Sequence, residues 1–485
     1  MCGIFFAENC SSEYPNIQLE HRGNHTITEK INGHLFVFNR LRINGILDTR
    51  LIKSIDQSVT ILVNGEIFNY DKFIGTSRTS DCDSVLSCYL SLRTMKTRQI
   101  VKELMELLDG DYAIIIYDSL MNRIIYFRDP LGVRPLFKGY LFNNVYLASE
   151  AKVLENIQGV SRIHPVKPVF YPYVNVGPST LHTEKIQYYL MNAVRKRLNI
   201  LDTGYSFLLS GGLDSSLVVG IARKILGPNV PIKTFSIKTE KETTNDEKYA
   251  LMVSKHCNTE HISVYISPEE LFGYITETIY YTETTDITTI RASTPMYYLC
   301  KFIKTAFPGN SVLFSGEGSD ELFCGYRYFL NYKKSDKKFP CKTESYRLLS
   351  ELYHYDVLRA DRTVAANTME LRVPFLDKEL VKYVLTSVPE ELIRPQNGVE
   401  KWLLRESFKS TGVIPHEVLM RTKDAFSDSV GNNWIDYIKS HVNDESGYYR
   451  NTYKNFYSKY SCWSSKWLPR WSSATDPSAR LEGLI

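Results

Sequence analysis

The sequence has no long hydrophobic run and little excess of one charge, and each of these absences argues against a class of protein. Its 485 residues include 58 Lys and Arg against 54 Asp and Glu, a balance that indicates no nucleic-acid or membrane-surface partner. The longest apolar stretches, such as residues 113–117, are too short to span a bilayer. The start, MCGIFFAENC, has no basic stretch and only a short apolar run. It is a poor signal peptide, and we expect a cytoplasmic protein.

The cysteines are scattered, and their spacing provides no disulfide framework. The chain has nine cysteines, an odd number, and no C-x-x-C pair. Cys82 and Cys88 have no His or Cys partner at a metal-binding spacing, so we predict no zinc site. Reduced thiols are the rule in a cytosolic protein.

What the sequence does have is a β-rich first third. Short runs of β-branched and aromatic residues predict strands, and helices are expected among them at 83–92 and 98–108. This mixture predicts a sheet sandwich with helical outer layers. The segment 164–180 contains four prolines and a glycine, so a linker is predicted there. The predicted strands are 34–41, 59–68, 112–118, 123–129 and 145–150.

After residue 184 the pattern changes to strands that alternate with helices. This alternation predicts a doubly wound parallel sheet, whose ligand loops follow the carboxyl ends of the strands. Asn245 or Asp246 is expected to cap one helix, and Ser267 with Glu270 forms a capping box at another. From residue 330 onward the chain is predicted to be mainly helical. The predicted strands are 205–209, 234–239, 262–266 and 311–316, and the helices are 185–198, 215–226, 267–281 and one that ends at 256.

The most informative stretch is LLSGGLDSSLVV (208–219), in which a buried strand turns through Ser-Gly-Gly into a helix. Glycines let the backbone approach an anion closely, and the helix start presents N–H groups to it. Asp214 would repel a phosphate unless a cation lies between them, so it indicates Mg²⁺. A plain glycine turn is the alternative. The stretch resembles the PP-loop of ATP pyrophosphatases, which cleave ATP to AMP and pyrophosphate, and it lacks the G-K-[ST] ending of a Walker A loop.

A second acidic loop follows a later strand, in FSGEGSDELFCGY (314–326). It concentrates Glu317, Asp320 and Glu321 within five residues. A solvated turn would explain this charge, but open α/β sheets bind ligands at strand ends. We therefore predict a ligand site here.

Cys2 directly follows the initiator methionine, and MCGIFF alone would favour a chance placement. If Met1 is removed, Cys2 carries both a thiol and a free α-amine. An α-amine with a pKa of about 8 can serve as the base for a thiol with a pKa of about 8.5. The alternatives are decided by the motifs that follow.

These motifs resemble the family of glutamine-hydrolysing asparagine synthetases. MCGIFF, HRG (21–23), LVNGEIFNY (62–70), TSDCDSV (79–85) and RDPLGVRPLF (128–137) are similar to the class II glutamine amidotransferase domain. SGGLDSS, TTIRASTPMY (288–297), SGEGSDE (315–321) and EKWLLRESF (400–408) are similar to the synthetase domain. The match covers about residues 2 to 440.

The resemblance implies an α/β and α+β fold in two domains. An N-terminal-nucleophile (Ntn) αββα sandwich would span residues 2–165, followed by a linker at 166–184. A doubly wound PP-loop domain with a helical C-terminal part would span 185–445, and 446–485 would be an extension.

The resemblance also assigns a glutaminase site. Cys2 attacks the glutamine amide and forms a thioester, while Asn64 and Gly65 supply the oxyanion hole. Arg40 holds the glutamine carboxylate, and Glu66 and Asp81 hold its amine. The chain departs from the family pattern at Asn24-His25, where Pro-Asp is usual, and in the loop after Arg40, where L-S-I-V is usual. The glutamine-binding residues of that loop are Leu41, Arg42, Ile43 and Asn44.

An ATP site is implied at two adjacent strand ends. Main-chain groups of Leu208 and Ile237 would hold the adenosine, and Asp214 and Asp320 would coordinate Mg²⁺ between the phosphates. The other implied ATP-binding residues are Ser210, Gly211, Gly212, Ser215, Ser216, Ser315, Gly316 and Lys401.

The remaining implied roles concern the reacting groups. Glu317 is linked to formation of the intermediate and to proton handling during ammonia attack. Thr288, Arg291 and Lys401 stabilise charge on the phosphates, and Arg359 binds the substrate carboxylate.

The implied reaction converts ATP, L-aspartate, L-glutamine and water to AMP, diphosphate, L-asparagine and L-glutamate. Its intermediates are the Cys2 thioester and β-aspartyl-AMP, and ammonia passes between the sites. ATP and Mg²⁺ are the cofactors, and the expected partners are small molecules. The sequence leaves the oligomeric state open, a homodimer included. Two alternatives to this function remain: the same two domains acting on another carboxylate, and a catalytically silent sensor of glutamine or nucleotide.

Overall fold

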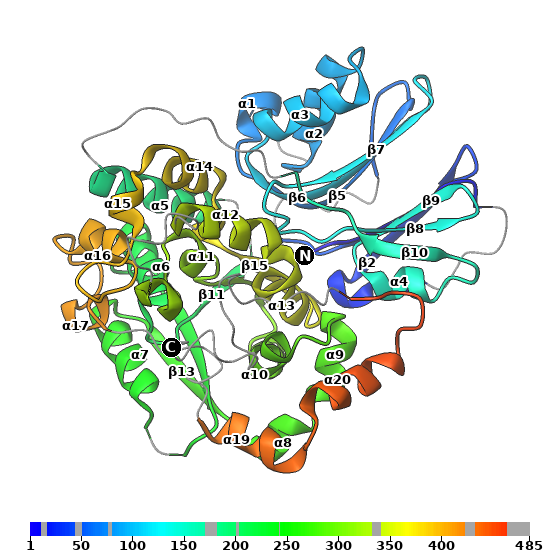
Figure 1. The fold of residues 1–485 in the computed structure, drawn as a ribbon. Helices are drawn as coiled ribbons and strands as arrows, with labels where there is room; N and C mark the ends of the chain where they lie inside the picture. The colour runs from blue at the N-terminus through cyan, green and yellow to red at the C-terminus, as the bar shows by residue number, and fades with distance from the viewer. Residues whose placement is uncertain are drawn as a thin grey trace.

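The computed structural model describes residues 1–10, 17–43, 51–75, 80–169, 182–199, 203–241, 243–331, 341–421 and 432–462. We call the described residues up to 169 the N-terminal half and those from 182 onward the C-terminal half. The two halves lie side by side, and the start of the chain lies between them (Figure 1). Within the described residues, no helix combines the length and apolar character needed to cross a membrane.

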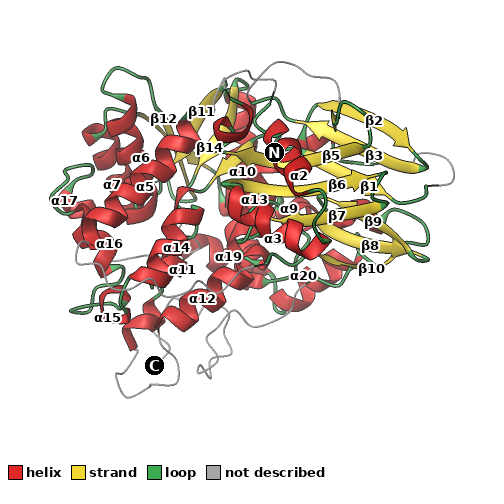
Figure 2. Ribbon diagram, turned by 90° about the horizontal axis from the view of Figure 1, so that it is seen from above, coloured by secondary structure: helices red, strands yellow, loops and turns green. Residues whose placement is uncertain are grey.

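The N-terminal half is built on two antiparallel sheets stacked on each other (Figure 1), which overlap when seen from above (Figure 2). The six-stranded sheet has the order β10-β8-β9-β1-β3-β2 and the other has the order β4-β5-β6-β7. The strands of the first sheet are β1 (Gly3–Ala7), β2 (His25–Ile31), β3 (His34–Arg40), β8 (Phe137–Leu141), β9 (Asn144–Ala148) and β10 (Ser161–Pro165). Those of the second are β4 (Ile52–Lys53), β5 (Val59–Ile67), β6 (Gly110–Asp118) and β7 (Arg123–Arg128).

Apolar side chains on both faces of β5 and β6 explain this stacking. Leu62 and Ile115 face the first sheet and share a core with Phe36, whereas Val63 and Ile114 face the helices. Side chains alternate between the two faces of a strand, so the apolar runs in β5 and β6 cover both. The covering helices are α2 (Asp83–Leu92) and α3 (Thr97–Leu107), with the short α1 (Asp71–Ile74) beside α2.

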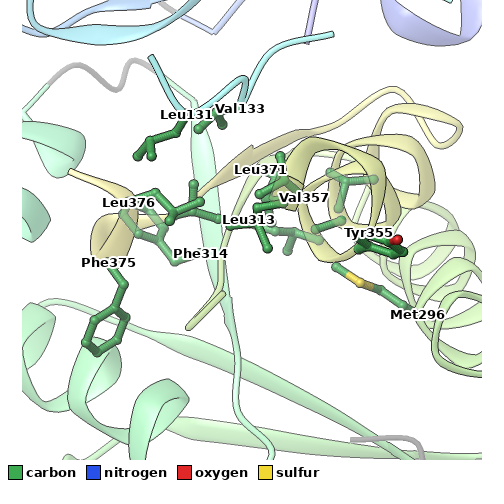
Figure 3. Packing of buried hydrophobic residues seen from close by; sticks show 14 of the residues in the cluster. Leu131, Val133, Met296, Leu313, Phe314, Tyr355, Val357, Leu371, Phe375 and Leu376 are labelled. Atoms are coloured by element: carbon green, nitrogen blue, oxygen red, sulfur yellow. The ribbon is translucent and has the colours of Figure 1, made fainter. Parts of the chain in front are cut away.

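The far face of the six-stranded sheet packs against α4 (Ala151–Glu155) and the C-terminal half. Phe5 and Ala7 of β1 belong to the same buried cluster as Leu154 of α4 and as residues of the C-terminal half. Leu131 and Val133 reach this cluster from the N-terminal half, above Leu371 and Leu376 (Figure 3). The two halves therefore share one continuous hydrophobic core.

The C-terminal half holds a five-stranded parallel sheet in the order β13-β12-β11-β14-β15. The chain extends to one side of β11 through β12 and β13 and then to the other through β14 and β15. This reversal creates a switch point at the end of β11, where such sheets bind ligands. The strands are β11 (Gly204–Leu208), β12 (Lys233–Lys238), β13 (Glu260–Tyr265), β14 (Asn310–Phe314) and β15 (Glu370–Arg372).

Helices flank the sheet and form most of the described chain beyond residue 341, as predicted. They are α5 (His182–Leu198), α6 (Leu213–Leu226), α7 (Asn245–His256), α8 (Pro268–Phe272), α9 (Ile275–Thr282), α10 (Ile287–Ala306), α11 (Ser319–Leu322), α12 (Cys341–Glu351), α13 (Asp356–Ala365), α14 (Lys378–Ser387), α15 (Glu390–Ile393), α16 (Trp402–Phe408), α17 (His416–Leu419), α19 (Asn432–His441) and α20 (Glu445–Lys454). The short 3₁₀ turns are Glu20–Arg22, Arg327–Asn331, Leu352–His354 and Pro374–Leu376.

The structure corrects two details of the sequence analysis. The helix cap predicted at Asn245 or Asp246 is Thr244, whose hydroxyl accepts a hydrogen bond from the Glu247 amide at 3.1 Å. Threonine followed three residues later by glutamate is the pattern of a capping box. The single helix predicted over 267–281 is two helices, α8 and α9, interrupted at Gly273, although Ser267 caps the first as predicted.

Candidate active sites

The first candidate site surrounds Cys2, immediately before β1. Strand β1 pairs with β3 so that Gly3 lies opposite Asn39, which brings the end of β3 beside Cys2. The Leu41 amide donates a hydrogen bond to the Cys2 sulfur at 3.4 Å. Burial raises the pKa of the Cys2 thiol, and the positive chain terminus opposes this shift.

Met1 precedes this thiol and is fully buried. Its amine donates a hydrogen bond to the Met369 carbonyl in the C-terminal half at 3.2 Å. Burial lowers the pKa of this amine to about 5. The chain start is therefore enclosed between the two halves.

Asn64 and Gly65 lie within β5, in the segment where it pairs with β6. Asn64 is fully buried, and neither its amide nitrogen nor its amide oxygen has a hydrogen-bond partner among the described residues. Gly65 has a φ of +148°, and a Cβ there would lie 2.0 Å from the Asp111 carbonyl oxygen. Buried amides are almost always paired, so an unpaired one is a ready donor for a ligand.

Two buried carboxylates, Glu66 and Asp81, complete this site. Asp81 accepts a hydrogen bond from the Ile67 amide at 2.7 Å, and Glu66 lies 3.7 Å from the Arg372 guanidinium. Burial and then the Asp81 charge raise the pKa of Glu66 well above its usual range. The Glu66 carboxylate also raises the pKa of the Cys2 thiol. An ammonium group placed here would relieve the repulsion between the acids.

The predicted glutamine-binding loop is described only in part. Arg40, Leu41 and Ile43 are buried and Arg42 is exposed. Asn44 lies outside the described residues.

The second candidate site lies where β11 and β14 end in the C-terminal half. Ser210 and Ser215 of the SGGLDSS loop have hydroxyl oxygens 3.2 Å apart, and the Ser210 amide donates to Ser215 at 3.3 Å. Gly211 has a φ of +78°, and a Cβ there would lie 2.4 Å from the Asp246 carbonyl oxygen. The buried Ser216 hydroxyl has no partner among the described residues. The loop is thus closely packed behind and keeps polar groups for a ligand.

The two strand-end loops touch at Gly316. A Cβ at Gly316 would lie 2.8 Å from both the Asp214 Cβ and the Ser215 amide nitrogen. Ser319, at the start of α11, donates a hydrogen bond to Asp214 at 2.7 Å. Ser315 is buried beside this contact, and Leu208 and Ile237 lie on the adjacent strands β11 and β12. The predicted nucleotide-binding residues of these strands and loops therefore converge at one edge of the sheet.

Lys401 joins the carboxylates of both loops. Its ammonium lies 2.5 Å from an Asp214 oxygen and 2.7 Å from an Asp320 oxygen, and the residue is 2% exposed. Two carboxylates therefore converge on a single cation. Within the described residues no three His, Cys, Asp or Glu side chains form a metal-binding group, so Mg²⁺ held here would complete its coordination with phosphate and water oxygens, as is usual for this ion. The two-acid donor set fits Mg²⁺.

Glu317 is held by α13. The Arg359 guanidinium donates to Glu317 at 2.8 Å and to Asp356 at 3.1 Å. Burial raises the pKa of Glu317, while the Arg359 charge opposes the shift. Asp356 is a neighbour that the sequence analysis missed, because its only signal was its position three residues before Arg359.

Arg291 pairs with an unexpected partner. Its guanidinium binds both oxygens of Glu445 at the start of α20, at 2.9 and 2.5 Å. Thr288 is buried one turn earlier on α10. Glu445 lies 154 residues away from Arg291, so nothing local in the sequence indicated this pair.

Comparison with known proteins finds matches over nearly the whole chain. The family model described as "Asparagine synthase" matches residues 185–342 and 333–460, and the one described as "Glutamine amidotransferase domain" matches residues 49–156. The chain is 36% identical to "Asparagine synthetase [glutamine-hydrolyzing]" of Gallus gallus over 99% of this chain and 98% of that protein. The Homo sapiens protein of the same name is 35% identical with the same coverage.

The chain belongs to the asparagine synthase family. The predicted family, which combines a glutamine amidotransferase domain with a synthetase domain in a carbon–nitrogen ligase, is confirmed. Among solved structures, a glutamine-dependent NAD⁺ synthetase from Acinetobacter baumannii has a TM-score of 0.28 at 15% identity, covering 72% of this chain and 53% of that chain. That likeness is too low to support an argument about the site.

Proposed function

We propose that this member of the asparagine synthase family makes L-asparagine from L-aspartate, with ATP as the activating substrate and L-glutamine as the nitrogen donor. The observation that carries the proposal is that one chain holds two distinct sites. One places a thiol beside the chain start, and the other gathers Asp214, Asp320 and Lys401 at the ends of parallel strands. Each site is suited to one half of the reaction.

In the N-terminal half, Cys2 acts as the nucleophile once Met1 is removed. Its sulfur attacks the glutamine amide carbon, ammonia leaves, and water then releases glutamate from the thioester. The unpaired Asn64 amide and the Gly65 amide stabilise the oxyanion. Glu66 and Asp81 hold the substrate ammonium, and Arg40 holds its carboxylate. We assign this chemistry to an Ntn-type domain over residues 2–165.

In the C-terminal half, the SGGLDSS loop binds the pyrophosphate of ATP in the manner of a PP-loop. Asp214 and Asp320 would hold Mg²⁺, which supplies charge neutralisation between the phosphates when bound. Leu208 and Ile237 present main-chain groups to adenosine, and the remaining contacts are those of Ser210, Gly211, Gly212, Ser215, Ser216, Ser315 and Gly316. We assign this work to a domain over residues 185–445, after a linker at 166–184 and before an extension at 446–485.

Activation gives β-aspartyl-AMP and releases diphosphate. Lys401 stabilises phosphate charge, together with Thr288 and Arg291, while Arg359 holds a substrate carboxylate and positions Glu317. Glu317 takes up the proton that ammonia must lose on attacking the acyl carbon. Burial raises the pKa of Glu317, which makes its carboxylate a stronger proton acceptor than an exposed one.

Ammonia must cross from one site to the other without entering water, where it is mostly protonated and not nucleophilic. The continuous core shared by the halves supports a dry route, because Met1, beside Cys2, is buried and contacts Met369 of the C-terminal half. A cytoplasmic location and a homodimer stay predictions.

One assay tests the function. The protein is mixed with ATP, Mg²⁺, aspartate and either glutamine or ammonium, and pyrophosphate and asparagine are followed. We expect asparagine from both nitrogen sources in the wild type. Cys2→Ala should lose glutamine-driven synthesis and keep ammonium-driven synthesis, because only the first requires the thiol. Equal loss of both, or product only with another carboxylate, would overturn the proposal.

A further inference from the structure

The Arg22 guanidinium connects the backbone of Cys2 to the opposite half of the molecule. Arg22 lies in the 3₁₀ turn Glu20–Arg22 and is fully buried. Its Nε donates to the Cys2 carbonyl oxygen at 3.0 Å. Its two terminal nitrogens donate to the Asp361 carboxylate at 2.9 and 3.3 Å, and one of them also donates to Glu150 at 2.7 Å. One rigid group therefore binds the nucleophile residue and a carboxylate 339 positions away.

The geometry of this bridge is well defined. A guanidinium is planar and presents its N–H groups in a fixed fork, so gripping both oxygens of Asp361 sets the direction of Nε. Asp361 is itself 2% exposed and lies on α13. A shift of α13 relative to the N-terminal half would displace Nε and with it the Cys2 carbonyl, one residue from β1.

The surrounding charges hold Asp361 and Arg22 in place. Arg362, the next residue on α13, binds Glu283 at 2.8 Å and lies 3.2 Å from Glu150. Glu150 also lies 2.9 Å from His21, next to Arg22 in the chain. Charged side chains buried this close together are stable only when each has an oppositely charged partner. The bridge is therefore part of a network of ion pairs that joins the two halves.

The same helix also reaches the synthetase site. Arg359 lies two residues before Asp361, about 200° around a helix of 3.6 residues per turn, and it binds Glu317 at 2.8 Å. One face of α13 thus holds the acid of the synthetase site, and the opposite face holds Arg22. A single rigid element contacts the machinery of both sites.

We propose that Asp361 is a positioning residue for the Cys2 thiol, acting through Arg22 on the Cys2 carbonyl. The inference rests on the proposed glutaminase role of Cys2. It adds that the geometry of this nucleophile is set by a carboxylate from the synthetase half, so that the glutaminase site is complete only when the two halves are docked.

The decisive variant is Asp361→Asn, which keeps the shape of the side chain and removes its charge. We expect kcat for glutamine hydrolysis to fall at least tenfold, with KM for glutamine within twofold, because Asp361 does not contact the glutamine site. Ammonium-driven synthesis should stay within twofold. The matched control is Asp109→Asn, which removes another carboxylate paired across the halves, to Lys196 at 2.6 Å. The control should leave both activities within twofold.

The reactivity of the Cys2 thiol tests the positioning role without relying on glutaminase activity. Alkylation of Cys2 by iodoacetamide, followed by peptide mass spectrometry with Cys10 as the internal reference, requires no turnover. We expect the relative rate at Cys2 to change at least threefold in Asp361→Asn and not in Asp109→Asn. A wild type without glutaminase activity would sink the proposed function, while the alkylation ratio would still decide the positioning role.

A second variant covers the case in which Asp361→Asn does not fold. Arg22→Lys keeps the charge, but one ammonium cannot hold both Asp361 oxygens and the Cys2 carbonyl in the same geometry. It should show the same selective loss of glutamine hydrolysis and the same change at Cys2. Equal loss of both activities, or an unchanged kcat and alkylation ratio, would overturn the proposal.

Discussion

The ammonium of Lys401 lies 2.5 Å from the Asp214 carboxylate, although the two residues are 187 positions apart. Lys401 directly precedes α16 and has a φ of +52°, a left-handed conformation that is unfavourable for a residue with a side chain. The contacts of the buried ammonium with Asp214 and Asp320 offset the cost of this backbone conformation. The contact links the phosphate-binding loop to the acidic loop through a single cation.

Removal of that cation should leave two carboxylates in mutual repulsion. We expect Lys401→Met to destabilise the ligand-free protein by about 3 kcal/mol, a usual cost of breaking a buried pair. Added Mg²⁺ should then raise Tm more in this variant than in the wild type, since the ion can take the vacated place between the acids. Differential scanning calorimetry with and without Mg²⁺ measures both effects. Lys409→Met, which removes an exposed lysine paired with Glu406, is the control; an equal response in the two variants would contradict the prediction.

We expect Asn64 to contribute to glutaminase activity at a cost in the stability of the fold. Its buried amide is unpaired among the described residues, and an unpaired buried polar group costs about 1–3 kcal/mol. We therefore expect Asn64→Ala to lower glutaminase kcat by about 10²-fold or more, while the free energy of unfolding in urea stays the same or rises. Asn69→Ala provides the contrast, because the Asn69 side chain is paired with Leu107 and Asp109 at 2.9 Å. That change should lower stability and spare catalysis, and a clear loss of stability in Asn64→Ala would refute the assignment.

Glu317 should be required for one reaction only. Its carboxylate is bound by Arg359 in the C-terminal half, away from the thiol. Glu317→Gln should therefore reduce asparagine formation at least 100-fold with either nitrogen source and leave glutamine hydrolysis within twofold. Coupled assays for pyrophosphate and glutamate measure the two reactions in one sample. Glu406→Gln changes a partly exposed acid and should affect neither; intact asparagine production in Glu317→Gln would rule out the proposed role.

His261 should make the protein sensitive to acid. Burial lowers the pKa of His261 from 6.5 to about 4, and the ring contacts the hydroxyls of Thr234 and Ser236 at 2.9 and 3.1 Å. Because the folded pKa is depressed, the unfolded chain binds the extra proton first. Stability is full above pH 6.5 and falls by up to about 1.4 kcal/mol per pH unit as the pH drops toward 4.

Urea denaturation at pH 7.5, 6 and 5 tests this behaviour. His261→Gln should remove part of the decline below pH 6.5, because glutamine takes up no proton. His164→Gln, at an exposed histidine, is the control and should follow the wild type. Parallel curves for the wild type and His261→Gln would show that another group causes the acid loss.

The features that could be predicted from the sequence are those whose causes lie within a few residues. The strand, glycine turn and helix around SGGLDSS depend on local chemistry, and the structure contains them almost as expected, with α6 starting at Leu213 instead of Ser215. The Thr244 cap also has a local signal, the capping-box spacing to Glu247, but the adjacent Asn245 and Asp246 are equally common cap residues.

Long-range partners could not be found in this way. Neither the Arg291–Glu445 pair nor the Arg22–Asp361 bridge leaves a local pattern, because each joins segments that only the tertiary fold brings together. Strand β15 has three residues and owes its conformation to pairing with β14. Such contacts depend on the order of strands in the sheet, which no single stretch of sequence encodes.

The buried position of Met1 has a consequence for the maturation of this protein. An aminopeptidase must draw the chain end into its own cleft, and here the first residue is enclosed against Met369. For Cys2 to act as proposed, Met1 therefore has to be removed while the nascent chain is still emerging from the ribosome, before the later-synthesised half closes over its beginning. A chain that kept Met1 until the halves docked would hold its amine against Met369, out of reach of an aminopeptidase.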